Sequence, residues 1–226
     1  MANKNLHIFI GPTAYDLPKN WKFSEHHHTH APVRRGDIER LNGTETSPAR
    51  ILIVDGVFHS HPAVGHAEIR NAINNGWEVW GVSSMGAIRA SEMLAMGMRG
   101  YGKIYDMFRS DLIDDDEVTL LHDANHPYTP ITEPLVHIKE FLLSLYARKL
   151  LDESALDSIF FSLKTRWYGY RTMRDVRDLL VSVGKLNEAL VLREIEEIKQ
   201  YRIKTLDFID FMNFIETEAE LRAVHD

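Results

Sequence analysis

Residues 77–98 constrain the fold of this chain most strongly, because the spacing of their apolar side chains changes abruptly partway along. Residues 77–82, WEVWGV, are rich in aromatic and β-branched side chains, which predicts a short buried strand. From Met85 onward the apolar residues recur at helical spacing. A strand that turns directly into a helix is typical of an α/β fold.

The turn between this strand and this helix reads GVSSMG, residues 81–86. Ser83 or Ser84 can cap the helix, since a serine oxygen accepts a hydrogen bond from a first-turn amide. The same amides, together with the helix dipole, can instead bind an anion or oxyanion. The segment that starts at Ser84 also resembles a nucleophile elbow, although valine at position 82 breaks the G-x-S-x-G pattern of the α/β-hydrolases. The turn alone favours capping.

The flanking residues extend this pattern. Residues 51–55 read as a second buried strand, and a helix follows from Pro62 to about residue 73. Residues 50–98 therefore alternate strand and helix twice, and residues 6–10 add a further apolar strand. We expect an α/β fold with a small, mostly parallel sheet flanked by helices.

The second half of the chain has a different character. From residue 132 onward, leucine, isoleucine and valine recur at helical spacing, which predicts an all-helical region. We therefore expect an α/β core domain at residues 1–131, and a helical region at 132–226 that packs on the core or docks a partner. Residues 118–121, directly after four acidic residues, are expected to form a strand.

Composition narrows the classes of function. The chain has 226 residues, no cysteine and a formal net charge of −7. It therefore has no disulfide, no thiolate metal site and no cysteine nucleophile. The evenly spread negative charge argues against nucleic acid as the main partner. No apolar run approaches membrane-spanning length and no signal peptide is recognisable, so a cytoplasmic protein without a membrane partner is expected.

Several polar residues are candidates for binding. Asp55 follows four aliphatic residues, at the carboxyl end of a strand, where ligands gather in open α/β sheets. The guanidiniums of Arg34 and Arg35, just before Asp37, suit a carboxylate or phosphate, although a solvated turn explains them equally. His66 shares a helix face with Arg70, and both are also consistent with plain surface positions.

Two clusters have the composition of metal ligands. Four histidines occur within five positions, and four consecutive acids follow later: His26, His27, His28 and His30, then Asp114, Asp115, Asp116 and Glu117. A metal-dependent hydrolase is one hypothesis for this chain. However, a loop cluster lacks the supporting hydrogen bonds that fix metal ligands, and acidic runs are usually solvated turns. We assign no metal and no cofactor.

Seven short motifs, in this order and spacing, together resemble the TfuA-like family across about residues 6–140. They are residues 8–13 (IFIGPT), 32–37 (PVRRGD), 55–58 (DGVF), 63–69 (AVGHAEI), 83–90 (SSMGAIRA), 97–102 (GMRGYG) and 115–118 (DDEV). The resemblance implies an accessory protein for YcaO enzymes, which use ATP to activate a peptide backbone amide for thioamidation. Such a protein is expected to hydrolyse the C-terminal thiocarboxylate of a ThiS-like sulfur carrier, to release sulfide near YcaO, and to assist binding of the precursor peptide or protein.

A Ser–Lys catalytic pair has been proposed for the family, and this raises Ser84 to the leading nucleophile. Ser83 lies beside it, and the amides of Met85 and Gly86 would hold the oxyanion. The base is less clear, because this chain has Ala67 where family members commonly have lysine.

Lys103 is the other lysine that the motifs offer as the base, and His66 is an alternative. Further residues match motif positions and either line the site or buttress it: Arg35, Asp37, Asp55, Glu68, Arg89, Asp115, Asp116 and Glu117. A third possibility is a non-catalytic adaptor that docks YcaO, the peptide substrate and the carrier.

Overall fold

The computed structural model describes residues 5–45, 47–58 and 60–224, with side chains described as far as residue 217. The chain forms two compact units. Unit 1 combines Met1–Ile113 with Lys204–Asp226, and unit 2 comprises Asp114–Ile203. This division differs from the expected boundary at residue 131, and it returns the last segment of the chain to the first unit.

Unit 1 is built on a parallel sheet. In the described part of the chain it has five strands, β1 (Leu6–Phe9), β2 (His27–His30), β3 (Arg50–Ile53), β4 (Glu78–Val82) and β5 (Arg99–Tyr101). Their order is β2-β1-β3-β4-β5, and every neighbouring pair is parallel. The α/β class expected from the sequence is therefore confirmed.

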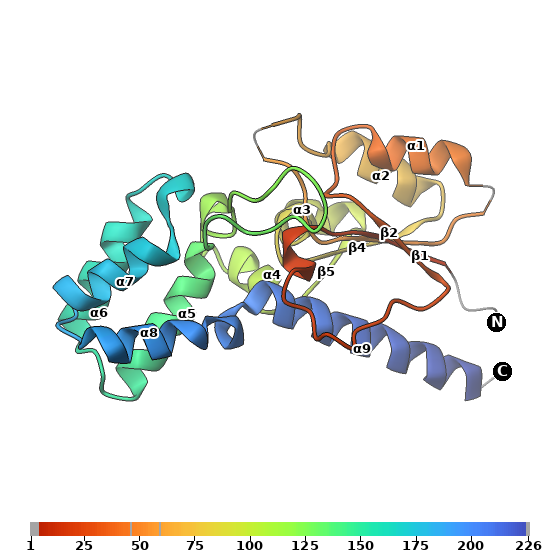
Figure 1. Cartoon of the computed structure of the whole chain (residues 1–226). Coiled ribbons are helices and arrows are strands. Elements are labelled where there is room, and N and C mark those ends of the chain that lie inside the picture. Colours follow the sequence, from red (N-terminus) through yellow and green to blue (C-terminus); the bar gives the residue numbers. More distant parts are fainter. Residues whose placement is uncertain (1–4, 46, 59, 225–226) are drawn as a thin grey trace. The chain divides into compact units, whose positions relative to one another are not determined.

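Helices cover both faces of this sheet, as the alternation of side chains along each strand requires. Ile51 and Ile53 of β3 pack toward α1 (Asp37–Thr44), α2 (His66–Asn74) and α3 (Met85–Met93). Leu52 and Val54 point to the opposite face and pack with α9 (Ile203–Val224). Figure 1 shows α1 and α2 on one side of the sheet and α9 on the other. The short elements of this unit are η1 (Pro12–Ala14), η2 (Leu94–Met96) and α4 (Lys103–Arg109).

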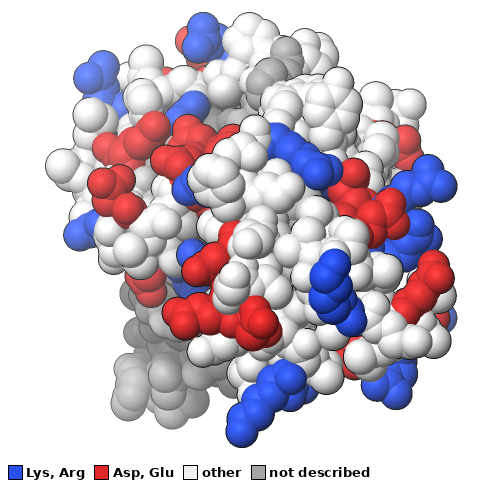
Figure 2. Space-filling view, turned by 90° about the vertical axis from the view of Figure 1, so that its left-hand side faces the viewer, with Lys and Arg blue, Asp and Glu red and all other residues white. Residues whose placement is uncertain are grey.

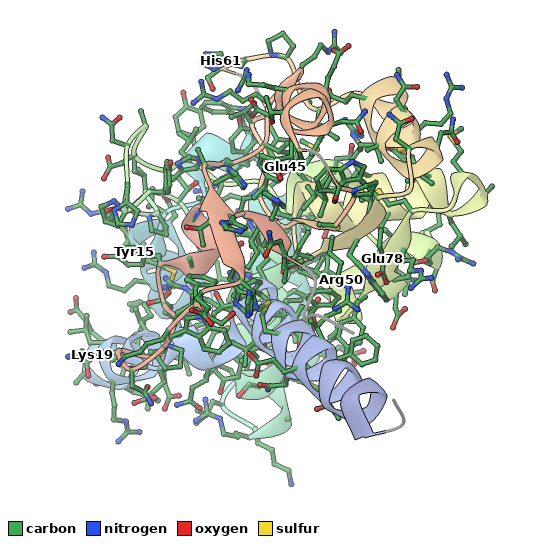
Figure 3. The ribbon with its side chains drawn as sticks, turned by 90° about the vertical axis from the view of Figure 1, so that its right-hand side faces the viewer. Tyr15, Lys19, Glu45, Arg50, His61 and Glu78 are labelled. Atoms are coloured by element: carbon green, nitrogen blue, oxygen red, sulfur yellow. The ribbon has the colours of Figure 1, made fainter. Side chains whose placement is uncertain are left out.

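The two ends of the strands differ in chemistry. At the amino ends, Arg50 and Glu78 lie side by side (Figure 3), with Arg50 Nε 3.1 Å from Glu78 Oε2. Arg99 adds a second ion pair to Glu78 at 2.7 Å. The carboxyl ends carry the glycine, serine and aspartate loops instead, so the candidate site lies at that edge.

Unit 2 is helical. It contains η3 (Asp115–Glu117), α5 (Leu135–Ala147), α6 (Glu153–Lys164), η4 (Tyr168–Tyr170), α7 (Met173–Ser182), α8 (Glu188–Glu196) and η5 (Ile198–Tyr201). The apolar stripes of α5 to α8 form one core. The fully buried guanidinium of Arg171 donates to the carbonyls of Leu163 and Asp116 and pairs with the Asp116 carboxylate.

The strand expected at residues 118–121 does not form. The preceding acids close a 3-10 turn, in which the Thr119 hydroxyl donates to the Asp115 carbonyl at 2.9 Å. Local hydrogen bonds therefore replace a sheet ladder, and only an isolated bridge between His122 and Pro130 is present in the described residues nearby.

On the face drawn in Figure 2, basic and acidic side chains are interspersed, and among the residues coloured there neither sign forms a continuous field. Within the described ranges, no helix has both the length and the apolar character needed to cross a membrane.

Candidate functional site

The candidate site lies where the strand order reverses. The sheet runs outward from β1 to β2 in one direction and from β3 to β5 in the other. In an open parallel sheet this switch point leaves a crevice at the carboxyl ends of the strands, and ligands bind there. The loops that begin at Gly11, Asp55 and Ser83 meet at this edge.

Asp55 joins the loops on the two sides of the switch point. Its buried carboxylate accepts hydrogen bonds from the amides of Gly11 and Thr13, both at 2.9 Å, and from the Thr13 hydroxyl at 2.7 Å. Three donors from the loop after β1 thus hold a side chain at the end of β3. The same carboxylate also has a cationic neighbour.

That neighbour is Lys204, a residue that sequence reasoning missed. It lies in the first turn of α9, is 2% exposed, and its Nζ is 3.6 Å from Asp55 Oδ1. Its carbonyl accepts a hydrogen bond from the Ser83 hydroxyl at 2.7 Å. The next residue, Thr205, donates from its hydroxyl to the Thr13 carbonyl at 2.8 Å. The start of α9 is therefore fastened to the loops after β1, β3 and β4.

A signal for Lys204 was present in the sequence. Lys204 falls at helical spacing with Phe208, Phe211 and Ile215, which form part of the apolar core against the sheet. A lysine on the apolar stripe of a helix is either buried with a partner or placed at a site. Its partners come from loops more than a hundred positions earlier in the chain, so periodicity alone could not identify them.

The serine turn after β4 is a strained elbow. Ser83 has φ of 66°, a left-handed conformation that is uncommon for residues other than glycine. Ser84 follows at the N-cap position of α3, and its side chain makes no capping hydrogen bond. The Ser83 hydroxyl is committed to Lys204, so neither serine plays the capping role that the sequence favoured. Strained backbone of this kind clusters at functional sites.

The amides after Ser84 differ from the expected oxyanion site. The Gly86 amide donates to the Val54 carbonyl at 3.2 Å, so it is already used inside the fold. Met85 is the first residue of α3, and the first amides of a helix have no intrahelical acceptor. Of the two amides expected to hold an oxyanion, Met85 is the one that the geometry supports.

The two expected bases lie in exposed positions. Lys103 begins α4 with an exposed side chain, and its backbone amide donates to Asp207 at 2.9 Å. His66 begins α2 and is exposed, with its Nε2 2.7 Å from Glu92 Oε2. Arg89 bonds the same Glu92 carboxylate at 2.6 Å and donates to the Val64 carbonyl at 3.0 Å. His66 and Arg89 thus share a carboxylate on the outer surface of α2 and α3.

Two of the motif acids buttress the arginine loop. The carboxylate of Glu68 is largely buried and accepts the amides of Gly65 at 2.8 Å and Gly36 at 2.9 Å. Asp37 accepts the Arg34 amide at 2.8 Å. These bonds fix the loop while the Arg35 side chain stays exposed, available to an anionic partner.

The later acidic motif belongs to unit 2. There Asp116 pairs with Arg171, and Glu117 lies 2.9 Å from Lys164 Nζ. Lys164 also reaches Asp114 at 3.2 Å, while Asp115 is exposed. The acids on either side of Asp115 therefore form ion pairs within unit 2.

Three of the four clustered histidines lie in β2, and His26 lies in the turn before it. His28 and His30 pack against His7 of β1, and His7 Nδ1 lies 3.1 Å from His30 Nε2. Burial lowers the pKa of His7, of His27 and of His30 below the ordinary value of 6.5, and the neighbouring histidines lower it further. Among the described residues, no three histidine or carboxylate side chains are placed to hold one metal ion.

One comparison with known proteins bears on this site. A family model described as TfuA-like protein matches residues 55–172, slightly more than half of the chain. This range includes Asp55 and the serine turn. No curated protein matches the chain.

Proposed function

Because the chain belongs to the TfuA-like family, we propose that it serves YcaO-dependent peptide backbone thioamidation by hydrolysing a thiocarboxylated, ThiS-like carrier protein to release sulfide. The family places the chain in the context of thioamidation. The reaction itself, the carrier, the precursor peptide and the YcaO partner are proposals.

The observation that carries the hydrolase proposal is the buried Lys204, held beside the serine turn by Asp55 and by the Ser83 hydroxyl. An amine that acts as a base must be unprotonated; burial favours that form of a lysine, whereas a neighbouring carboxylate such as Asp55 favours the protonated form. The exposed side chain of Lys103 lacks this environment. We therefore assign the base to Lys204, in place of Lys103 or His66.

In this mechanism, the Ser84 hydroxyl attacks the thiocarboxylate carbon while Lys204 takes the hydroxyl proton. The Met85 amide stabilises the oxyanion of the tetrahedral intermediate. The carbon–sulfur bond then breaks as Lys204 passes its proton to the leaving sulfur, so that hydrosulfide departs with the bonding electron pair and Lys204 is again a neutral amine. Water next attacks the acyl-serine ester and regenerates Ser84, so the carrier ends in an ordinary carboxylate. No electron transfer is required.

The test measures sulfide released from a thiocarboxylated ThiS-like protein by wild type, Ser84→Ala and Lys204→Met. Each variant is expected to lose at least about a thousandfold in rate, because the nucleophile and its base act as one unit. Ser91→Ala is the matched control, since Ser91 lies on α3 and its hydroxyl donates to the Ile88 carbonyl of the same helix. Release by Ser84→Ala at the wild-type rate would rule out this nucleophile.

A second candidate is a non-catalytic adaptor for YcaO, the carrier and the peptide. Ala67 favours it, since this exposed position of α2 lacks the lysine common in the family. The adaptor proposal expects no sulfide release by the wild type, with binding to YcaO intact. Lys103→Ala, measured in parallel, separates the two lysines: loss of release in this variant alone would move the base from Lys204 to Lys103.

A further inference from the structure

Asp207 of α9 caps the amino end of α4. Its Oδ1 accepts the Lys103 amide and its Oδ2 accepts the Ile104 amide, both at 2.9 Å. α4 begins after Gly102, which has no side chain to cap the helix, so its first amides depend on another element. A carboxylate at a helix N-terminus also interacts favourably with the helix dipole.

Gly102 is the residue that permits this contact. Its φ is +98°, and a Cβ placed there would lie 2.6 Å from the Asp207 carboxyl carbon. Any side chain at position 102 would therefore push the carboxylate away, in addition to straining the backbone. The glycine motif at residues 97–102 thus has a specific task, which is to let α9 approach the loop after β5.

Asp207 lies three residues after Lys204, so the two share a face of α9. We propose that Asp207 is a positioning residue, which fixes the first turn of α9 so that Lys204 stays against Asp55 beside the serine turn. This inference rests on the proposed function, in which Lys204 is the base. Asp207 itself contacts α4 and has no part in bond making.

The surroundings of Asp207 make this anchor sensitive to pH. Burial raises the pKa of Asp207 to about 6, while the two amides and the charge of Lys103 oppose the rise and Asp210 adds to it. The Tyr101 hydroxyl faces the same region and donates to Asp210 at 3.0 Å. Below about pH 6 the carboxyl group gains a proton, and a neutral acid is a weaker acceptor for the two amides.

The first experiment follows sulfide release from pH 5 to 8 in wild type and Asp207→Asn. Wild-type kcat is expected to fall as the pH drops through about 6. Asp207→Asn is expected to lower kcat by on the order of 10-fold to 100-fold at pH 8 with little change in KM, and to lose the part of the acid limb that has its midpoint at about 6. A variant with the wild-type kcat and an unchanged acid limb would overturn the proposal.

Asp210→Asn is the matched control, one turn further along α9. It removes a charge that raises the pKa of Asp207, so its acid limb is expected to move to lower pH while kcat at pH 8 is retained. A shift to higher pH would contradict the assignment of the limb to Asp207.

The second experiment needs no activity. NMR follows the amides of Lys103 and Ile104 and the side-chain Cε of Lys204 against pH in the resting protein. All three are expected to shift in wild type with a common midpoint of about 6, and the Lys204 shift is expected to vanish in Asp207→Asn. If the Lys204 chemical shift in wild type did not change across this pH range, the positioning role of Asp207 would be overturned. If all three signals shift together but the wild-type protein releases no sulfide, only the hydrolase proposal is refuted, and the positioning of Lys204 by Asp207 stands.

Discussion

Gly86 lies where the backbone of α3 packs directly against the sheet. A Cβ at this position would lie 1.7 Å from the Ile53 carbonyl oxygen, which is backbone and cannot move aside. Gly81 faces Gly86, and a Cβ added at Gly81 would lie 2.0 Å from the Gly86 carbonyl oxygen. These two glycines set how deeply the serine turn sits at the end of β4, and thus where Ser84 lies.

We expect Gly86→Ala to destabilise unit 1 by about 2–4 kcal/mol, because the added methyl group forces α3 away from β3. Urea denaturation measures this change. Gly43→Ala is the control, since Gly43 lies in α1 and a Cβ added there would meet no heavy atom within 4 Å. The free energy of unfolding of this variant should rise by about 0.5–1 kcal/mol. Equal stabilities for the two variants would contradict the close approach described here.

At the residue level, the sequence predicted a candidate site residue only where that residue stands next to a recognisable strand or helix. Asp55 and the serine turn stand directly after strands, so their place at the carboxyl edge was predictable. Lys204 was not, because the Ser83–Lys204 bond joins residues 121 positions apart. The use of the Gly86 amide by the Val54 carbonyl is likewise a contact between elements that local spacing does not reveal.

At the scale of elements, β2 is an edge strand in which three of the four residues are histidines. His7 on the neighbouring strand packs between His28 and His30 and is 4% exposed, with its Nε2 unpartnered in the described structure. The lowered pKa of His7 means that the folded chain holds this ring neutral where the unfolded chain would protonate it. Its contribution to stability is therefore complete above about pH 6.5 and is lost as the pH falls below that value.

We expect His7→Phe to reduce the difference in unfolding free energy between pH 7.5 and pH 5.5. Phenylalanine keeps the aromatic packing and removes the titrating group. Urea midpoints at the two pH values give the measurement, and the exposed His61, labelled in Figure 3, provides His61→Phe as the control. A pH difference as large in His7→Phe as in wild type would assign the effect to other groups.

The alternation of elements between residues 50 and 98 was predictable because each segment has a clear apolar period. The prediction of a strand at residues 118–121 was wrong, because apolar content alone does not show whether a neighbouring strand is available for pairing. There the hydroxyl and carboxylate groups of the turn satisfy the backbone locally. The histidine strand was missed for the opposite reason, since its side chains lack the usual composition of a strand.

At the scale of the whole molecule, unit 1 is discontinuous in sequence. Its sheet is complete by residue 101, but one face is covered by α9, which follows all of unit 2. Phe208, Phe211 and Met212 of α9 are buried against that face. Removing α9 would expose the apolar side chains of β1, β3 and β4 to water.

A chain that ends at residue 203 is therefore expected to lose the native packing of unit 1 while the helices of unit 2 remain. Exposed apolar surface should appear as strong binding of the dye ANS, with loss of the near-UV circular dichroism signal. The full chain measured in parallel is the control. Cooperative unfolding of the shortened chain, with no ANS binding, would show that α9 is dispensable.

The place of α9 in the chain also has a consequence during synthesis. A ribosome completes the five strands first, then spends on the order of ten seconds on unit 2 before Lys204 is made. Throughout that interval the serine turn exists without its lysine. The newly made chain therefore passes through a stage in which all five strands have been synthesised but one face of the sheet is still uncovered, and the proposed site is completed only when α9 has been translated.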